Sequence, residues 1–322
     1  MVIVWRVLET CNLSCPFCAY DKRLAIPRNV ADPEHIARFI ELLGRWRRHS
    51  GQDVLVSWLG GEPLLWKPLD ELTRLARANG IEISTTTNGT SLGSQKVRHH
   101  LMECYKEVTF SVDGFSDFHD QMRGWPGAFS KLSRGVRLLA EECRLTGARL
   151  RLRANVVLMR GNIVRFPDLC RELASWGISE ISFNQLGGRD RPEFFPDNRL
   201  MPNDVETLKE LLPPLRLELA AQSANLLGGG AYLDRIRDSA LEIELPISDC
   251  RIANQFIFID EHGSIAPCSF AAGHFGVRVG DMRDVADLDE LAGRLNAHQR
   301  HKPSAECSNC RSTQQFSKFD AP

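Results

Sequence analysis

Strand-like and helix-like segments alternate along the first part of this chain, up to about residue 186. Runs rich in β-branched, aliphatic and aromatic residues predict strands at 2–9, 54–59, 81–87, 107–112, 150–158 and 180–185. Amphipathic segments between them, such as 33–49 and 163–176, have helical periodicity. This alternation predicts an α/β fold with a parallel sheet and right-handed crossovers. Six such units are too few to close an eight-stranded barrel, so we expect a partial (β/α)₆ barrel or an open sheet, with ligands at the carboxyl ends of the strands.

Charge and hydropathy exclude several classes of protein. The formal net charge is −1, which argues against a nucleic-acid binder that relies on phosphate neutralisation. No stretch reaches the roughly 20 apolar residues of a membrane span, and the N-terminus lacks the basic start of a signal peptide. We therefore expect a cytoplasmic protein without a membrane partner. The ten cysteines are then predicted to be metal ligands or buried thiols and not disulfides.

The chain after the sixth strand divides into three parts. Residues 187–204 contain helix-breaking and charged residues, so this loop is predicted to lie over the mouth of the sheet. Five of its charged side chains are candidates for substrate binding or proton transfer: Arg189, Asp190, Arg191, Glu193 and Asp197. A connecting segment at 201–248 is predicted to hold a helix, a break at Pro213-Pro214, a hinge at Gly228–Gly230 and a second helix. The predicted domains are thus 1–200, 201–248 and a cysteine-bearing module at 249–322.

Three cysteines, Cys11, Cys15 and Cys18, follow the first predicted strand. Closely spaced thiolates on a loop suit an iron–sulfur cluster, whereas a structural zinc site prefers four ligands. A cubane held by three cysteines leaves one iron free to bind another molecule. Spacing alone leaves the zinc alternative open.

The C-x₃-C-x₂-C spacing, with the aromatic Phe17 before the third cysteine, resembles the signature of the radical S-adenosylmethionine (radical SAM) superfamily. The resemblance implies a TIM-like partial barrel over about residues 3–186. It also implies a 4Fe–4S cluster on Cys11, Cys15 and Cys18, and SAM bound to the open iron. Reductive cleavage of SAM would then release a 5′-deoxyadenosyl radical that abstracts a hydrogen atom from a substrate.

Further segments in the expected order resemble the SAM-binding elements of that family. Gly60-Gly61-Glu62-Pro63 matches its GGEP segment, and the resemblance implies that Glu62 accepts the cofactor's ammonium group. The SxDG, TNG and HDxxRG elements are matched by Ser111–Gly114, Thr87–Gly89 and His119–Gly124. Ser111 is the candidate ribose contact, while Asp113 could orient the loop instead. The residues implied in cofactor binding are Phe17, Gly60, Gly61, Glu62, Asn88, Ser111, Asp113 and Arg153, with Asn155 as an alternative to Arg153.

A second set of four cysteines lies near the C-terminus: Cys250, Cys268, Cys307 and Cys310. A β-hairpin with its turn at 261–263 is predicted between the first two, and a helix over about 284–299 before the last two. Four thiolates saturate either a zinc ion or a 4Fe–4S cubane, and spacing does not choose between them. The arrangement resembles the twitch module, a shortened SPASM domain, which implies one auxiliary 4Fe–4S cluster. Cys104, Cys143 and Cys170 are predicted to be buried structural thiols.

The resemblance implies how the radical is formed, but it does not specify which reaction the substrate then undergoes. We expect oxidation of a carbinol in a small sugar-like or aminocyclitol-like substrate, as a step of natural-product or antibiotic biosynthesis. Radical epimerisation is an alternative, but it needs a hydrogen donor, and only Tyr20 among the tyrosines is close to the first cysteines. A peptide- or protein-modifying maturase is the other alternative, less favoured because the first strand starts at about residue 2 and leaves no room for a leader-binding domain.

An enzyme is favoured over a metal-binding scaffold that has lost the reaction. A degenerate scaffold should have lost at least one of Cys11, Cys15, Cys18 and Glu62, and all four are present. The resemblance also implies a reducing partner protein such as flavodoxin or ferredoxin. The residue that accepts the proton stays unknown, and no catalytic side chain is assigned.

Overall fold

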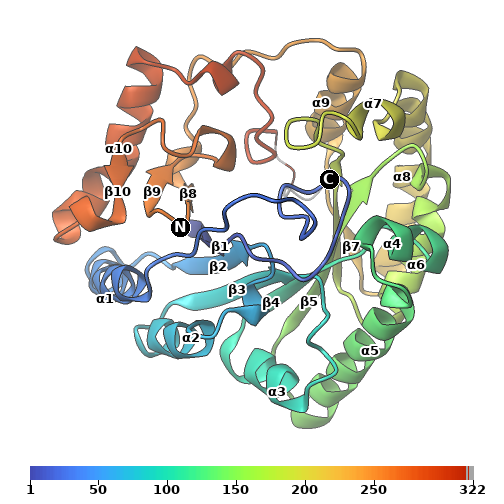
Figure 1. Ribbon diagram of the computed structural model, residues 1–322, viewed down its shortest axis with the longest axis horizontal. Coiled ribbons are helices and arrows are strands. Elements are labelled where there is room, and N and C mark those ends of the chain that lie inside the picture. Colours follow the sequence, from blue (N-terminus) through green and yellow to red (C-terminus); the bar gives the residue numbers. More distant parts are fainter. Residues whose placement is uncertain (317, 319–322) are drawn as a thin grey trace.

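The computed structural model describes residues 1–316 and 318 and contains one curled sheet with helices on its convex side (Figure 1). The strands follow the order β10-β9-β8-β1-β2-β3-β4-β5-β6-β7. Every neighbouring pair from β8 to β7 is parallel, and β9 is antiparallel to both β8 and β10. The strands are β1 (Val2–Leu8), β2 (Leu55–Gly60), β3 (Glu82–Thr87), β4 (Glu107–Ser111), β5 (Arg151–Leu158), β6 (Glu180–Gln185), β7 (Asn225–Leu226), β8 (Phe256–Ile259), β9 (Ser264–Ala266) and β10 (Val277–Arg278).

The helices form an outer layer around the curled sheet (Figure 1). They are α1 (Pro33–Ser50), α2 (Leu69–Ala78), α3 (Gln95–Cys104), α4 (Ser116–Arg123), α5 (Ala128–Thr146), α6 (Phe166–Ser175), α7 (Phe195–Asn198), α8 (Pro202–Ala221), α9 (Gly230–Ala240) and α10 (Val285–His301). α1 begins with two features typical of a helix N-terminus. The Asp32 side chain accepts a hydrogen bond from the Glu34 N–H, and Pro33 occupies the first turn. Gly51, at φ 69°, ends the helix in the left-handed region.

The core lies between the strands and this helical layer. Alternate residues of β1 and β2 point toward the helices, so Trp5 and Trp58 are paired in the β1–β2 register and are both buried. Their rings lie 6.2 Å apart, and the Phe39 ring of α1 meets Trp5 edge-on at 5.5 Å. The residues between them point to the concave side, which is the side that faces a ligand in a barrel.

The predicted fold class and the first six strands are confirmed. The observed strand bounds differ from the predicted ones by at most one residue at either end. The partial barrel is larger than six units, however, because β7 and β8 extend the parallel sheet on its two sides. β8 pairs in parallel with β1, with Val2 opposite Phe256.

The C-terminal cysteine-bearing segment continues the barrel sheet. The predicted hairpin is confirmed: β8 and β9 flank a turn that includes Gly263, at φ 76°. The predicted helix near 284–299 is α10, which packs beside α1, where Trp46 Nε1 donates a 2.7 Å hydrogen bond to Asp289 Oδ1. Residues 317 and 319–322, at the end of the predicted 249–322 module, lie outside the described residues.

The predicted helix break at Pro213-Pro214 is wrong. α8 runs through both prolines, although each removes a backbone donor and costs a helix interior about 3 kcal/mol. Four leucines on one face of this helix are almost fully buried, at 208, 212, 215 and 219. We attribute the continuity to this packing, because burial of an apolar helix face outweighs local propensity.

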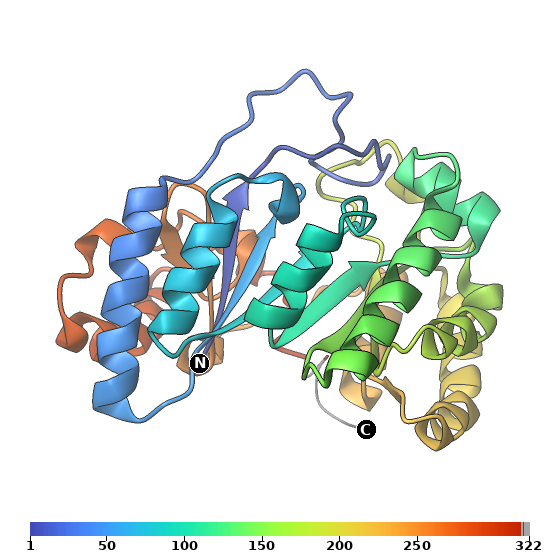
Figure 2. The ribbon, with the colours of Figure 1, turned by 90° about the horizontal axis from the view of Figure 1, so that it is seen from below.

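The long loop between β1 and α1 crosses the carboxyl ends of the strands (Figure 2). The predicted cover at 187–204 meets this loop, since Arg191 Nη1 lies 3.1 Å from Oδ2 of Asp21. The cover also contains the short helix α7, which the sequence analysis did not predict. No described helix is long and apolar enough to cross a membrane.

Candidate active site

The first three cysteines lie on the loop that follows β1, at the carboxyl ends of the parallel strands (Figure 2). Backbone and side-chain N–H groups point at their sulfur atoms. Leu13 N lies 3.4 Å from Cys11 Sγ, and Tyr20 N lies 3.4 Å from Cys18 Sγ. Arg123 Nη1 lies 3.9 Å from Cys15 Sγ. Such donors stabilise thiolates and tune the potential of an iron–sulfur cluster.

The three thiols affect one another electrostatically. Burial is the main cause that raises the pKa of Cys11 and Cys15, and it raises that of Cys18 to about 12. The charge of neighbouring cysteines raises the pKa of Cys15 and Cys18 further. A bound cation is therefore needed to hold all three as thiolates, and an iron–sulfur cluster has the donor chemistry that fits.

A buried ion pair lies next to the loop that carries the first three cysteines. Arg123 Nη2, at the end of α4, lies 2.7 Å from Asp113 Oδ2, and the Asp113 side chain has no exposed surface. Asp113 Oδ1 accepts a 3.0 Å hydrogen bond from Val157 N, which links the ends of β4 and β5. Arg123 therefore contacts a cysteine ligand and the strand ends at once.

The remaining residues of the His119–Gly124 segment have local roles. His119 Nδ1 accepts a hydrogen bond of 3.1 Å from Asp113 N, and burial lowers the pKa of His119 to about 3. The Asp120 carboxylate accepts hydrogen bonds from the N–H groups of Gly127 and Phe129 before and within the first turn of α5. Gly124 has φ 59°, and a Cβ there would lie 2.1 Å from Ser14 Oγ. This glycine thus lets the cysteine loop approach α4.

Gly60 and Gly61 bring the end of β2 against the cysteine loop. A Cβ on Gly60 would lie 2.4 Å from the Leu8 carbonyl oxygen, and one on Gly61 would lie 2.2 Å from the Thr10 carbonyl oxygen. Gly61 N donates to Leu8 O at 2.8 Å, and Glu62 N donates to Thr10 O at 3.0 Å. Both glycines are therefore required by close backbone contact between the two segments.

Glu62 is fully buried and joins the ends of β2 and β3. Its carboxylate accepts hydrogen bonds from Thr87 Oγ1 at 2.7 Å, Asn88 N at 2.7 Å and Leu64 N at 3.2 Å. Burial raises its pKa to about 7 against the opposing effect of these donors. Three of the roughly four acceptor positions of this carboxylate are thus occupied, and its contact with the cofactor's ammonium group stays a prediction.

The other predicted cofactor residues lie at different depths of the barrel. Asn88 Nδ2 donates to Asn12 Oδ1 at 2.9 Å and lies 3.8 Å from Cys11 Sγ, so it belongs to the cysteine site. Ser111 is at the carboxyl end of β4, and the Phe17 ring lies 5.6 Å from the Arg123 guanidinium. Arg153 lies near the start of β5 and pairs with Glu107, at 2.7 Å, and with Glu180. The structure therefore brings all of these residues except Arg153 to the mouth, and the cofactor role of Arg153 stays a prediction.

A cavity of about 470 Å³ opens between the first cysteine loop and the C-terminal segment. Its wall includes Cys18, Tyr20, Phe17 and Arg6 on one side and Phe270 on the other. Arg6 donates to the Glu261 carboxylate and, at 3.0 Å, to the Tyr20 hydroxyl oxygen, so it ties the two sides together. Of the five candidate loop residues, Arg189 and Asp190 line this cavity.

The other three loop candidates are engaged elsewhere or exposed. Arg191 binds Asp21 and Glu193 at the edge of the loop, and Asp197 is exposed on α7. Asp21 has almost no exposed surface and also pairs with Arg23. Asp21 and Arg191 therefore fasten the cover to the cysteine loop.

The four C-terminal cysteines also come together. Burial raises the pKa of Cys250 and Cys310 and raises that of Cys268 to about 11. The charges of Cys250 and Cys310 contribute to the rise at Cys268, and the charge of Cys307 contributes at Cys250. None of the ten cysteines forms a disulfide in the structure. Four free thiols at one place fit a saturated metal ion or cluster.

Cys104 and Cys170 are buried and Cys143 is half-buried. Within residues 1–316 and 318, no group of three or more His, Cys, Asp or Glu side chains has the geometry of a metal site. The members of each cysteine set do affect one another electrostatically, and metal coordination by either set stays a prediction.

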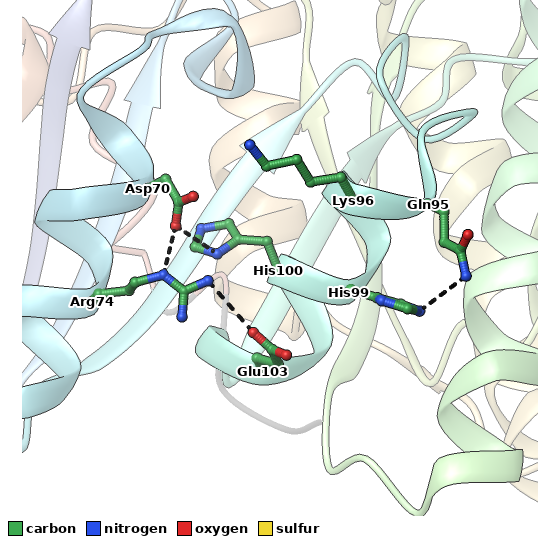
Figure 3. Close-up of a pocket in the computed structure, with 7 residues that line it drawn as sticks. All are labelled: Asp70, Arg74, Gln95, Lys96, His99, His100 and Glu103. Atoms are coloured by element: carbon green, nitrogen blue, oxygen red, sulfur yellow. Dashed lines mark hydrogen bonds and ion pairs between the residues drawn. The ribbon is translucent and has the colours of Figure 1, made fainter.

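A second cleft, between α2 and α3, is separate from the cysteine sites (Figure 3). Asp70 Oδ1 accepts from Arg74 Nε at 2.9 Å and lies 3.0 Å from His100 Nδ1, and Arg74 also pairs with Glu103. Asp70, Arg74 and Glu103 pair with one another on the outer helical layer, whereas the buried ring nitrogens of His100 have no hydrogen bond among the described residues. The cleft contains no cysteine, so the mouth of the barrel is the candidate active site.

A family model matches part of the chain, in its N-terminal region. Residues 5–145 match the family model described as "Radical SAM superfamily". This match supports membership of the radical SAM superfamily. The matched range contains the three cysteines, the glycine pair and Arg123, and the superfamily implies a 4Fe–4S cluster and SAM as cofactors.

Similar proteins with established names include a heme synthase and a peptide cyclase. An "AdoMet-dependent heme synthase" of Methanosarcina barkeri is 23% identical over 95% of this chain and 90% of its own length. A "PqqA peptide cyclase" of Xanthomonas campestris pv. campestris is 25% identical over 89% of this chain and 72% of its own length.

Solved structures show the same fold. SuiB of Streptococcus suis bound to its precursor peptide SuiA has a TM-score of 0.68 and 19% identity over 98% of this chain and 70% of its own. The structure of anSMEcpe with AdoMet and the Cp18Cys peptide has a TM-score of 0.65 and 18% identity over 98% of this chain and 87% of its own. These likenesses establish the fold of this chain, and the sugar or aminocyclitol substrate finds no support among them.

Sequence reasoning missed two features of the site. It noted Arg123 only as part of a motif, although the side chain joins Cys15 to Asp113. It also gave no role to Arg6, whose position on the concave face of β1 follows from the alternation of that strand. The alternation was visible in the sequence, but the partners Glu261 and Tyr20 were not.

Proposed function

We propose that this protein is a radical SAM enzyme that modifies a peptide. The observation that carries the radical chemistry is the set of three convergent thiols, Cys11, Cys15 and Cys18, with N–H donors on their sulfur atoms at the carboxyl ends of a parallel barrel. When bound, a 4Fe–4S cluster supplies the electron that cleaves SAM and yields a 5′-deoxyadenosyl radical. The peptide substrate is supported by the PqqA peptide cyclases among the relatives and by the peptide complexes among the structural neighbours.

Different residues of this chain are proposed to contact the cluster and SAM. Asn88 and Arg123 donate toward the cysteine sulfur atoms, and Glu62 has an acceptor position left for the SAM ammonium group. The cavity walled by Phe17, Tyr20 and Phe270 lies between the two cysteine sites, so we place the reacting part of the substrate there. Its position under the 187–194 loop shields a radical from solvent.

The four C-terminal cysteines are proposed to hold an auxiliary 4Fe–4S cluster. Zinc is the alternative that four thiols also accommodate. With all cysteines used, the cluster cannot easily bind substrate and would serve as an electron conduit or as a wall of the pocket. An oxidative outcome needs such an acceptor for the second electron, whereas an epimerisation does not.

A tetrapyrrole is the second candidate substrate. The heme synthase of Methanosarcina barkeri aligns with nearly all of this chain, and a 30% identical relative from the same organism is a "Fe-coproporphyrin III synthase", aligned over 58% of this chain and 44% of its own length. The carbohydrate oxidation expected from the sequence has no comparable support. We therefore place peptide first and tetrapyrrole second.

The test is an anaerobic reconstitution with iron and sulfide, followed by reduction with dithionite in the presence of SAM. We expect 5′-deoxyadenosine from the parent, none from Cys18→Ala, and parent-like amounts from the matched control Cys143→Ala. Iron should fall from about eight to about four per chain in Cys268→Ala if the auxiliary site holds a cubane. Zinc together with about four irons in the parent would refute the auxiliary cluster.

Substrate class is tested in the same assay. Peptides encoded beside the gene, Fe-coproporphyrin III and aminocyclitols are supplied in turn, in deuterated water. A mass change in a peptide that depends on SAM supports the proposal, and turnover of the porphyrin alone would replace it with the second candidate. Absence of 5′-deoxyadenosine from a fully loaded parent would refute the radical SAM reaction itself.

A further inference from the structure

The segment after Cys310 turns back into the barrel. Arg235 on α9 donates two hydrogen bonds to the Cys310 carbonyl oxygen, at 2.9 and 2.7 Å. Its guanidinium also lies 5.4 Å from the centre of the Phe316 ring. Lys318 N then donates to Thr313 O at 3.2 Å, which closes a turn. Cys310 and Phe316 are thereby held against α9.

The Lys318 side chain ends among residues of β5 and β6. Its Nζ lies 3.0 Å from Asn155 Oδ1 and 2.8 Å from Asn184 Oδ1, and the residue is buried. Both asparagines alternate with Ala154, Val156 and Phe183, which face the helical layer, so their side chains are on the concave face. Burial, with the charge of Arg153, lowers the pKa of Lys318 to about 7.

These contacts fix which way the Asn155 amide is turned. An ammonium group is only a donor, so the atom of Asn155 that it contacts must be the carbonyl oxygen. The same oxygen accepts from Ser182 Oγ at 3.0 Å and from Asn184 Nδ2 at 3.3 Å. Nδ2 of Asn155 is then directed away from Lys318, and it donates to none of the residues that the structure describes.

The freed amide lies next to the predicted ribose contact. Asn155 is opposite Ser111 in the β4–β5 register, and Val112 N donates to Asn155 O at 3.1 Å. Side chains of paired residues on one face of a sheet lie about 5 Å apart. Ser111 Oγ and Asn155 Nδ2 together form a pair of polar groups suited to a ribose diol.

We propose that Lys318 is a positioning residue of the SAM site, which holds Oδ1 of Asn155 so that Nδ2 of Asn155 is presented, beside Ser111, to the ribose of SAM. The proposal rests on the proposed function, because it requires the chain to bind SAM. It gives the C-terminal tail a role in the barrel. The tail starts at Cys310, so the C-terminal cysteine site and the SAM site are joined by one short segment.

The test is the dissociation constant of SAM, measured by equilibrium dialysis with the anaerobically reconstituted holoenzyme. Lys318→Met keeps the length and burial of the side chain but removes its donors, and we expect SAM to bind about tenfold more weakly. Asn155→Ala should weaken SAM binding by a similar factor. The double variant should bind no more weakly than Asn155→Ala alone, because Lys318 acts through Asn155. Lys209→Met on the outside of α8 is the matched control and should bind like the parent.

Two results would overturn the proposal: unchanged SAM binding in Lys318→Met, or a double variant in which the two effects multiply to about a hundredfold. Iron content and thermal melting are recorded for each variant. Should Lys318→Met fail to fold, Asn155→Ala decides alone, since unchanged binding in that variant overturns the proposal and a tenfold loss supports it. A parent enzyme that holds its iron but binds no SAM would instead refute the proposed function.

Discussion

Arg123 Nη2 lies 2.7 Å from Asp113 Oδ2 in a pair that is almost entirely buried, while Nη1 of the same side chain lies 3.9 Å from Cys15 Sγ. One guanidinium thus connects the first cysteine loop to the ends of β4 and β5. Because the carboxylate has no exposed surface, the pair is sensitive to loss of either partner.

Replacement of Arg123 by Met should destabilise the protein by about 3–5 kcal/mol, because it leaves the Asp113 carboxylate buried without a counter-charge. Urea unfolding measures the loss. The double variant Arg123→Met/Asp113→Asn should recover part of it, since the uncompensated charge is then removed. A loss below about 1 kcal/mol in the single variant would mean that the pair is more hydrated than its burial indicates.

Gly61→Ala should separate the cysteine loop from β2. Its Cβ would lie 2.2 Å from a backbone oxygen of Thr10, and backbone on both sides leaves little freedom to adjust. We expect a loss of about 1–3 kcal/mol and reduced iron per chain after reconstitution. Gly93→Ala is the matched control, because no atom lies within 4 Å of the added Cβ. Equal melting temperatures for the two variants would contradict the expected contact.

His119 should make stability depend on pH. Burial and the charge of Arg123 lower its pKa in the folded protein to about 3, whereas an unfolded histidine titrates near 6.5. The unfolded chain therefore binds a proton first as pH falls, and the contribution that is fully present above pH 6.5 is lost progressively toward pH 3. Between pH 7.5 and 5.5 this loss amounts to about 1.4 kcal/mol.

The measurement is urea unfolding of the parent and of His119→Asn at both pH values. Asn can offer its Oδ1 as an acceptor to Asp113 N without titrating, so its decrease between the two pH values should be smaller by about 1.4 kcal/mol. His35→Gln, at an exposed position of α1, serves as the control and should follow the parent. Parallel curves for the parent and His119→Asn would show that His119 is protonated in the folded state.

Asp21→Asn should loosen the cover over the mouth. The Asp21 carboxylate is the group that Arg191 and Arg23 share, and a neutral amide holds two guanidinium groups less tightly. Trypsin should therefore cut after Arg189, which belongs to the same cover and is exposed, several-fold faster in this variant than in the parent. Asp197→Asn changes an exposed acid of the same cover and should leave the rate unchanged. An unchanged rate in Asp21→Asn would show that other contacts hold the cover.

The parallel barrel and its first six strands could be predicted because periodicity is a local property. Trp5, Trp58 and their neighbours alternate between a buried helical side and a concave side, and this pattern is written in each strand separately. The cysteine spacing and the glycine pair could be recognised in the sequence because they too are local patterns. The structural roles of Gly60 and Gly61 could not be predicted, because these glycines allow close contact with the backbone of a segment some 50 residues earlier.

Long-range contacts decided the rest. The prolines of α8 predict a break, and only the burial of its leucine face keeps the helix continuous. The pairing of β8 with β1 joins residues about 250 positions apart, which no local pattern encodes. The same holds for Arg6 with Glu261 and for Lys318 with Asn155. By itself the sequence determined the first six strands, most of the helices and the spacing of the cysteines, because these depend on neighbours in the chain. The tertiary structure decided which charged groups meet in the barrel, because burial makes their pairing obligatory only after the chain has folded.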